Sequence, residues 1–388
     1  MVTGYWGVAE LPLHDGHVPR WMAERMKRLL RAIVAFIVED RGPGWLVERL
    51  ADPLWFQALN NVIGMDWDSS GSTTVLTGLL RQVTETGEFG LMVAGGKGRR
   101  ALETPSDLEV IGEKLGLSSS RVEYLKRVSR LAAAADSSLL QDGFQLYHHT
   151  VIVAEDGSWT IVQQGMSLEE RVARRYHVSH RVVHEGVETL EPHTGVVSRL
   201  RRSAVLDLTS RASLEARRVI VDVAREKPER VLRLLREAIA VARGVVPLTS
   251  FSGGKRPSQT VIRYYRPLKP PDPRRIEPVL RRVYELQPDT IEALVSIRGV
   301  GPATIRALAL IAELVYGSEA SHEDPAVTDP LRYAFAVGGK DGYPYPFDAK
   351  TAEEAAAVLE EAVAKARIGD REKLEAIRKL RRLLRPPV

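Results

Sequence analysis

Apolar residues recur at helical spacing between residues 18 and 50, with basic residues between them. A stripe of this period predicts a surface helix that covers a core. Helical spacing returns over residues 105–136. Residues 52–100 instead mix glycine, short apolar runs and polar turns, which indicates a mixed α/β unit.

The clearest strand pattern is FQLYHHTVIVAEDGSWTIVQQGM, in which two β-branched runs flank Asp156-Gly157. This dipeptide is typical of a two-residue hairpin turn. A hairpin of that kind places His149 opposite Gln164 and Thr150 opposite Gln163, so polar side chains gather at its open end.

The remaining chain is predicted to be helical on both sides of a linker. Residues 198–246 are rich in arginine and contain no strand pattern, whereas 249–275 are rich in Gly, Pro, Ser and Arg and suit an exposed arm against a phosphate backbone. We therefore predict the α+β class, with an N-terminal mixed α/β unit that contains a β-hairpin and a mainly α-helical C-terminal domain with a helix-hairpin-helix. The predicted divisions are 1–197 for the catalytic α+β domain, 198–248 for an arginine-rich helical segment, 249–275 for the linker and 276–388 for the helical domain.

The composition is that of a soluble globular protein, with 44% hydrophobic and 27% charged residues in a chain of 388, enough for two or three domains. A net charge of +5 favours an anionic partner. The chain has no cysteine, which excludes disulfides, thiolate metal sites and a cysteine nucleophile.

The N-terminus lacks the pattern of a signal peptide, and no apolar run reaches the roughly 18 residues of a membrane span. We therefore expect a cytoplasmic protein without a membrane partner. Asn60 and Asn61 are the only asparagines, and segments rich in opposite charges are abundant, which favours a thermophilic source.

The stretch SIRGVGPATIRALAL predicts two helices joined at Gly299-Val300-Gly301. Asp289 or Thr290 is placed to cap the first helix, and Pro302 suits the first position of the second. The glycines permit positive φ and leave the loop without bulky side chains, so its amides can approach a phosphate. A tight turn that uses glycine only for packing remains the alternative.

This stretch resembles the helix-hairpin-helix motif, in which an apolar residue lies between two glycines that join short helices. The resemblance implies sequence-independent binding of one DNA backbone through loop amides. A further basic loop, Gly338-Gly339-Lys340, is a second candidate contact. The predicted DNA-binding residues are Arg298, Gly299, Val300, Gly301, Ala303, Thr304, Arg306 and Lys340.

Some base-excision glycosylases resemble this arrangement and carry an aspartate after the second helix, a position that Asp329 would fill here. Ala303 stands where bifunctional members have a Schiff-base lysine, which argues against a lyase. The alternative is that Asp329 caps a helix that begins at Pro330.

Over nearly its full length the chain resembles a prokaryotic family known as a domain of unknown function, family 763. The phrases that carry this resemblance include WFQALNNVIGMDWDSSGSTT, DGFQLYHH, VQQGM, ARRYH and AVGGKDGYPYP. One difference is Asp68, where the family's usual phrase DWHSSG has His. The resemblance implies no established activity.

Carboxylates and histidines of the N-terminal half form the candidate chemical site. Such side chains can hold a divalent metal that activates water against a phosphodiester. The predicted catalytic residues are Asp66, His149, Gln164 and His177, and the predicted metal ligands are Asp66, Asp68, His148, His149 and His193.

Structural roles are the alternative for the same residues. Asp66 with Ser69 can form an Asx turn, and neighbouring histidines on a strand face opposite sides, so one of them is expected to be structural. Gln163 and Gln164 can read base edges, hold a water or satisfy backbone groups. The glycine-rich loops lack Walker spacing, so no nucleotide cofactor is expected.

We therefore predict a DNA-processing enzyme, a metal-dependent nuclease of repair or recombination, that grips the DNA backbone through the helix-hairpin-helix. A base-excision glycosylase that uses Asp329 and a non-catalytic DNA-binding or scaffolding protein are the alternatives.

Overall fold

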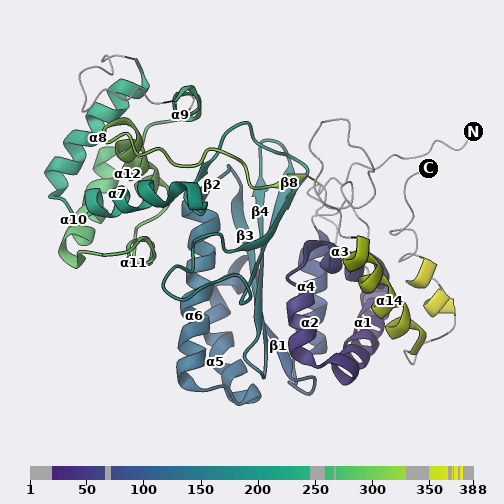
Figure 1. Ribbon diagram of the computed structural model, residues 1–388. Coiled ribbons are helices and arrows are strands. Elements are labelled where there is room, and N and C mark those ends of the chain that lie inside the picture. The colour runs from purple at the N-terminus through teal and green to yellow at the C-terminus, as the bar shows by residue number, and fades with distance from the viewer. Residues whose placement is uncertain are drawn as a thin grey trace, which may run out of the picture.

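A six-stranded sheet lies at the centre of the protein, between two layers of helices, and a further group of helices adjoins one end (Figure 1). The structure is a computed structural model that describes residues 20–65, 71–244, 258–265, 268–328, 349–365, 369, 371–374 and 376–378. The predicted α+β class is confirmed.

The strands of the sheet follow the order β1-β3-β4-β5-β6-β8, and all neighbours are antiparallel except the parallel pair β6 and β8. Most strand residues are buried, because helices cover both faces. The strands are β1 (Leu91–Lys97), β3 (Gln145–Ala154), β4 (Trp159–Ser167), β5 (Val172–Ser179), β6 (His193–Ser198) and β8 (Val327–Thr328).

The predicted β-hairpin is confirmed as β3 and β4, but its register differs by one residue from the prediction. Gly157, with φ 84°, ends a three-residue loop, and its amide donates to the Ala154 carbonyl at 2.9 Å. A glycine in the left-handed region at the end of such a loop adds one residue to the connection. His149 therefore lies opposite Gln163, and His148 lies opposite Gln164.

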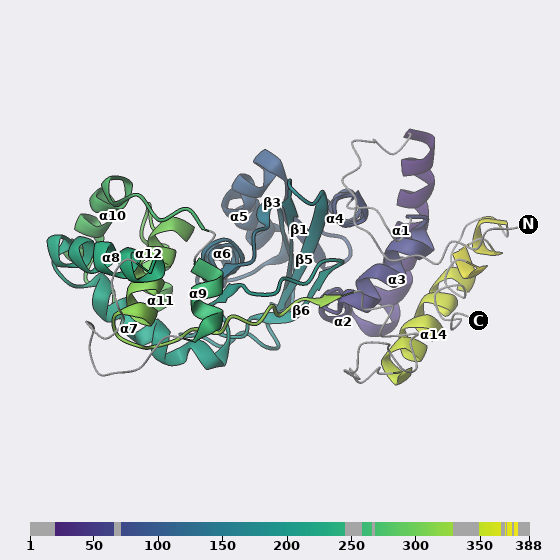
Figure 2. The same cartoon turned by 90° about the horizontal axis from the view of Figure 1, so that it is seen from above.

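Helices α5 (Thr104–Leu115) and α6 (Ser119–Ala134) cover one face of the sheet, and Figure 2 shows these layers from above. The 3₁₀ turn η1 (Gly98–Glu103) precedes α5, and the π-helical turn η2 (Ala135–Leu139) extends α6. Their apolar side chains pack against Val151, Val153 and Ile161 of the hairpin.

Helices α2 (Pro43–Arg49), α3 (Pro53–Ile63) and α4 (Gly71–Val83) cover the other face, and α1 (Arg20–Arg41) packs on them. The single helix expected over residues 18–50 is therefore two helices. Gly42 has φ 85°, and Pro43 opens α2, so the first helix cannot continue. Gly116, with φ 67°, ends α5 and divides the second predicted helix in the same way.

Helix α14 (Ala349–Lys365) packs against α1 and α3, although it lies near the end of the chain. Leu359, Ala362 and Val363 enter the core of the N-terminal helices. The predicted division at 276–388 is therefore wrong for this helix. Its apolar stripe is visible in the sequence, but the surface that the stripe covers is set by the tertiary structure.

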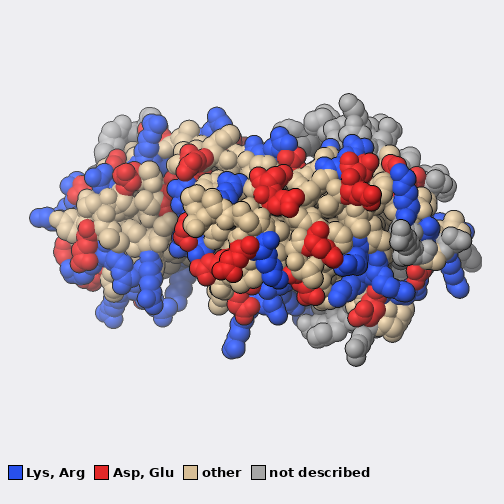
Figure 3. All heavy atoms as spheres, turned by 90° about the horizontal axis from the view of Figure 1, so that it is seen from below, with Lys and Arg blue, Asp and Glu red and all other residues tan. Residues whose placement is uncertain are grey.

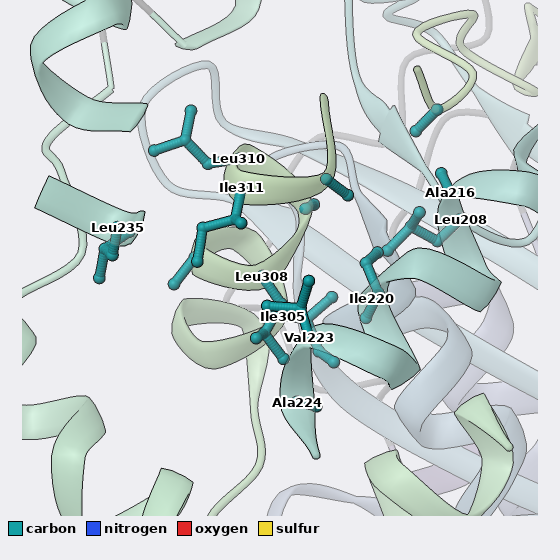
Figure 4. Close-up of a cluster of buried hydrophobic side chains, with 14 of the residues drawn as sticks. Leu208, Ala216, Ile220, Val223, Ala224, Leu235, Ile305, Leu308, Leu310 and Ile311 are labelled. Carbon is teal, nitrogen blue, oxygen red and sulfur yellow. The ribbon is translucent and has the colours of Figure 1, made fainter. Parts of the chain in front are cut away.

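The remaining helices form one cluster, which we call the helical group. Their apolar faces share a core in which α12 packs against α7 and α8. Figure 4 shows Ile305 and Leu308 of α12 beside Val223 of α7. The members are α7 (Leu214–Ala224), α8 (Pro228–Ala242), α9 (Gln259–Tyr265), α10 (Pro273–Leu286), α11 (Ile291–Ser296) and α12 (Pro302–Leu314).

Two predictions for the middle of the chain are wrong. Residues 198–213 contain the short strand β7 (Leu206–Asp207), paired with β2 (Leu140–Gln141), and the 3₁₀ turn η3 (Arg211–Ser213), so the predicted helical segment begins only at α7. The described part of the predicted linker contains α9, whose Tyr264 and Tyr265 are buried in the helical group, so it is no exposed arm there.

Candidate functional site

The connection between α11 and α12 has the predicted helix ends. The Thr290 hydroxyl accepts a hydrogen bond from the Ala293 amide at 3.1 Å and caps α11. Pro302 occupies the first turn of α12, where its missing N–H leaves no hydrogen bond unmade. Of the two predicted caps, Thr290 is therefore the one that the structure uses.

The loop itself presents backbone rather than side chains. Gly299 is exposed and has φ 100°, a conformation that side chains disfavour. Gly301 is the N-cap of α12 and, as a glycine, has no side chain with which to cap this helix. The first amides of an α-helix lack partners within the helix, so those of α12 remain available to a ligand.

The residues predicted to bind DNA differ in the exposure of their side chains. Arg298 and Ala303 are exposed, and the Arg298 carbonyl accepts from Arg282 at 2.6 Å. Val300 packs partly on the helical core, and Arg306 is half-buried. Thr304 is only 3% exposed, so its side chain is buried and the predicted contact with DNA is left to its backbone amide. Lys340 and Asp329 lie outside the described residues.

His148 and His149 point to opposite faces of the sheet, because adjacent residues of a strand alternate. His149 Nδ1 donates to Gln163 Oε1 at 2.7 Å, and its Nε2 lies 2.7 Å from the Ser129 hydroxyl on α6. Gln163 in turn donates to Asp136. This buried chain lies under α6, and burial lowers the pKa of His149.

His193 completes that chain at its other end. Its Nε2 lies 2.5 Å from Asp136 Oδ1, within the π-helical turn η2. Burial alone would lower the pKa of His193, but the charge of the Asp136 carboxylate raises it above its ordinary value. His193 and Asp136 therefore form a buried hydrogen-bonded pair in which the carboxylate favours the protonated ring.

A second polar group lies on the opposite face, under α3 and α4. Pairing across four adjacent strands aligns Lys97, His148, Gln164 and Arg175 in one row. His148 Nε2 lies 3.1 Å from the Thr77 hydroxyl of α4. Burial, together with the nearby His149 and Lys97, lowers the pKa of His148 to about 3, so this ring is neutral.

His177 shares that face, two positions beyond Arg175 on β5. Its Nδ1 donates to the Leu50 carbonyl at 3.1 Å, and its ring meets Phe56 edge-on. Burial and the charge of Arg175 hold the pKa of His177 well below its ordinary value. His148 and His177 lie on strands that are separated by β4, so roughly 10 Å divides them across the sheet.

The prediction that these histidines share one metal centre is therefore wrong. His149 and His193 lie on one face, His148 and His177 on the other, and no single ion can reach both. Within the described ranges no three His, Asp or Glu side chains are grouped as metal ligands. Asp66 and Asp68 lie outside the described residues.

A cleft of about 660 Å³ opens between α4, β1 and α5, beside His148. Basic side chains line it, including Arg81, Lys97 and Arg100. Arg81 forms an ion pair with Asp107, whose Oδ2 also accepts from the Gly95 amide at 2.8 Å. The glycine-rich stretch of residues 95–100, which spans the end of β1 and the start of η1, thus contributes to one wall of a basic cleft.

The sequence reasoning did not single out Arg175, Ser129 or Asp136. Two adjacent arginines in the β-branched segment VARRYHVS were the available signal, because a strand buried on both faces rarely carries charge without a partner. Arg174 has such partners, since it bonds Asp324 at 2.8 Å and Asp142 at 2.8 Å. Arg175 faces the other side of the sheet and has no such partner among the described residues.

The fold and these polar groups define an α+β protein whose helix-covered sheet is joined to a helical group with an exposed glycine loop. The chain belongs to the family described as "Protein of unknown function (DUF763)", whose model matches residues 7–347. Comparison with curated proteins and with solved structures gives no match. No helix in the described part of the chain has both the length and the apolar character to cross a bilayer.

Proposed function

We propose that this protein binds DNA without sequence preference through the α11–α12 loop. The observation that carries the proposal is the exposed Gly299, with its positive φ, next to an α12 N-terminus whose N-cap residue, Gly301, has no capping side chain. Amides at such a terminus bind phosphate oxygens, and the helix dipole favours the negative charge.

The charges around the loop support a polyanionic partner. Arg298 is exposed in the loop, and Arg282 lies beside it, with its guanidinium on the Arg298 carbonyl. Figure 3 shows Lys and Arg side chains projecting along the lower edge of the helical group, at the left of the view. Phosphate contacts of this kind position a protein on DNA without reading its sequence.

The test uses Gly301→Asp, which places a carboxylate at the N-cap. Asp is a favourable N-cap, and Gly301 has φ −142° with no atom within 4 Å of an added Cβ, so the variant should fold. The carboxylate would occupy the free amides and repel phosphate. We expect affinity for a labelled DNA duplex to fall at least about tenfold, which is the loss of roughly one charge-assisted hydrogen bond.

The matched control is Lys227→Ser at the N-cap of α8, which also lacks a side-chain cap. Both substitutions change the net charge by one negative unit, and both add a capping side chain. Equal losses of affinity in the two variants would show that binding depends on overall charge, and would reject the α11–α12 loop as the DNA-binding site. Wild-type binding should also weaken steeply with salt, because phosphate contacts release counterions.

Metal-dependent DNA cleavage at the basic cleft is our second proposal. His148 lines this cleft and is neutral, which is the form of histidine that binds a divalent metal, and Lys97 and Arg100 supply positive charge for phosphate. Asp66 and Asp68 remain the proposed carboxylate ligands. The remaining predicted catalytic residues, His149, Gln164 and His177, are not among the residues that line this cleft.

Labelled single-stranded, duplex, branched and lesion-bearing DNA should be incubated with Mg²⁺ or Mn²⁺, with and without a chelator. We expect the DNA to be cleaved, and the chelator to abolish this cleavage. The variants His148→Ala and Asp66→Ala should each lose the cleavage activity but still bind DNA. His184→Ala, at an exposed histidine, is the control. Release of a free base would favour the glycosylase that uses Asp329, and binding without either activity would favour the non-catalytic alternative.

A further inference from the structure

Arg175 is a buried cation without a counterion among the described residues. It is 1% exposed, and its guanidinium lies 4.6 Å above the ring of Phe56. Within the described part of the chain its hydrogen bonds run only to neutral oxygens, on Gln57 at 3.2 Å, on Thr73 at 3.4 Å and on Pro53 at 3.5 Å. Charge-assisted hydrogen bonds are normally 2.7–2.9 Å long, so these contacts satisfy the charge poorly.

The neighbouring Arg174 shows what this fold does with a buried arginine elsewhere. Arg174 is fully buried, and it bonds Asp142 at 2.8 Å and both carboxylate oxygens of Asp324 at 2.9 and 2.8 Å. A buried charge without such a partner costs several kcal/mol. Two adjacent arginines of one strand therefore differ in the presence of a carboxylate.

Other polar atoms on the elements that surround Arg175 also lack partners among the described residues. They belong to α3, α4 and β5, and every one of the side chains is at least nine-tenths buried. Gln57 and Asn61 lie one turn apart on α3, so they share a face of that helix. We call the following set the Arg175 cluster: Gln57, Asn60, Asn61, Ser72, Arg175 and His177, with unpartnered atoms Gln57 Nε2, Asn60 Oδ1, Asn61 Nδ2 and Oδ1, Ser72 Oγ, Arg175 Nε and His177 Nε2.

The unpartnered atoms are donors and acceptors together. Arg175 Nε, Gln57 Nε2 and Asn61 Nδ2 can only donate. His177 donates through Nδ1 to Leu50, so Nε2 of the neutral ring accepts, and Asn60 Oδ1 accepts as well. A ligand that matches this set carries negative charge, several acceptor oxygens and at least one O–H.

We propose that the Arg175 cluster binds a protonated phosphate group, either inorganic phosphate or a terminal phosphomonoester. Its anionic oxygens pair with Arg175 and accept from the amides, and its O–H donates to His177 Nε2. Sulfate has the same shape and charge but no O–H near neutral pH, so it should bind more weakly. Because the cluster is buried, binding requires α3 and α4 to move away from the sheet. The proposal does not depend on DNA binding at the α11–α12 loop.

The first test is thermal unfolding of the full chain with inorganic phosphate, with sulfate, and with a dinucleotide that carries or lacks a 5′-phosphate. We expect phosphate at a hundred times its Kd to raise Tm by about 3 °C, and sulfate to raise it less at equal ionic strength. A larger effect of the phosphorylated dinucleotide would identify a strand end as the ligand, and an effect of inorganic phosphate alone would identify the free anion. Absence of stabilisation by every phosphate, or equal stabilisation by sulfate, would overturn the proposal.

Two variants locate the effect. Arg175→Met keeps an apolar stem over Phe56 and removes the unpaired charge, so the Tm without phosphate should stay the same or rise, and the response to phosphate should disappear. Ser72→Ala removes one unpartnered hydroxyl and should fold even if Arg175→Met does not. It should weaken phosphate binding about tenfold, as measured by calorimetry. A full response to phosphate in either folded variant would reject the Arg175 cluster as the site.

Discussion

His149 Nδ1 donates a hydrogen bond to Gln163 Oε1 at 2.7 Å, directly across the β3–β4 pair. The contact fixes the tautomer of His149, so that its Nε2 accepts from the Ser129 hydroxyl at 2.7 Å. Both ring nitrogens of His149 are thereby used within the core. This pairing ties α6 to the hairpin and leaves His149 no lone pair for a metal.

His149→Ala should therefore lower the free energy of unfolding by about 3 kcal/mol. The substitution leaves a cavity and removes the partners of the buried Gln163 and Ser129. Urea unfolding at pH 7 measures the change, and the exposed His184→Ala should stay within about 0.5 kcal/mol of wild type. A His149→Ala variant as stable as its control would contradict a structural role for this ring.

Acid should destabilise the protein through His148. Burial lowers the pKa of His148 in the folded state from 6.5 to about 3, so the unfolded state binds the proton more readily between these values. Stability that is present above pH 6.5 is therefore lost as the pH falls. At pH 5 the loss from this residue is about 2 kcal/mol.

Urea unfolding of wild type and His148→Gln at pH 7 and pH 5 isolates this contribution. The other histidines titrate in both proteins, so their effects cancel in the comparison. The variant should lose about 2 kcal/mol less than wild type between the two pH values. Identical pH dependence in the two proteins would show that His148 does not resist protonation in the folded state.

Asp324→Ala should lower the free energy of unfolding by roughly 3–5 kcal/mol. Asp324 accepts hydrogen bonds from both Nη atoms of Arg174 and from the Arg202 amide. It lies in the segment between α12 and β8, which connects the helical group to the sheet. Loss of the Asp324 carboxylate leaves the buried guanidinium of Arg174 with only Asp142 as a counterion among the described residues. The control is Glu361→Gln, which breaks the exposed i,i+4 ion pair between Glu361 and Lys365. This substitution should change the free energy of unfolding by less than about 0.5 kcal/mol.

The two loop glycines should differ in their effect on stability. Gly299→Ala forces a side chain into φ 100° and brings its Cβ to 3.3 Å from Val279, which should cost about 1–2 kcal/mol. Gly301→Asp requires no such conformation and adds a cap, so it should be neutral or stabilising by a few tenths of a kcal/mol. Thermal unfolding of both variants checks the order, and a larger loss for Gly301→Asp would contradict this loop conformation.

Local features of the sequence determined much of the secondary structure. Asp156-Gly157 between β-branched runs specified a hairpin, and Thr290 with Pro302 specified the ends of α11 and α12. These features act within a few residues, through turn conformation and capping, so they can be predicted without the rest of the chain. The exact register of the hairpin was not predicted, because Gly157 in the left-handed region shifted it by one residue.

Only the tertiary structure decided which polar residues meet. Arg174 and Arg175 are adjacent and chemically identical in the sequence, yet the strand sends one to Asp324, 150 residues away, and the other to the Arg175 cluster under α3. In the same way the sequence grouped four histidines that the sheet divides between its faces. Alternation along a strand is visible in the sequence, but the helices that cover each face are brought there by long-range packing, which no local pattern encodes.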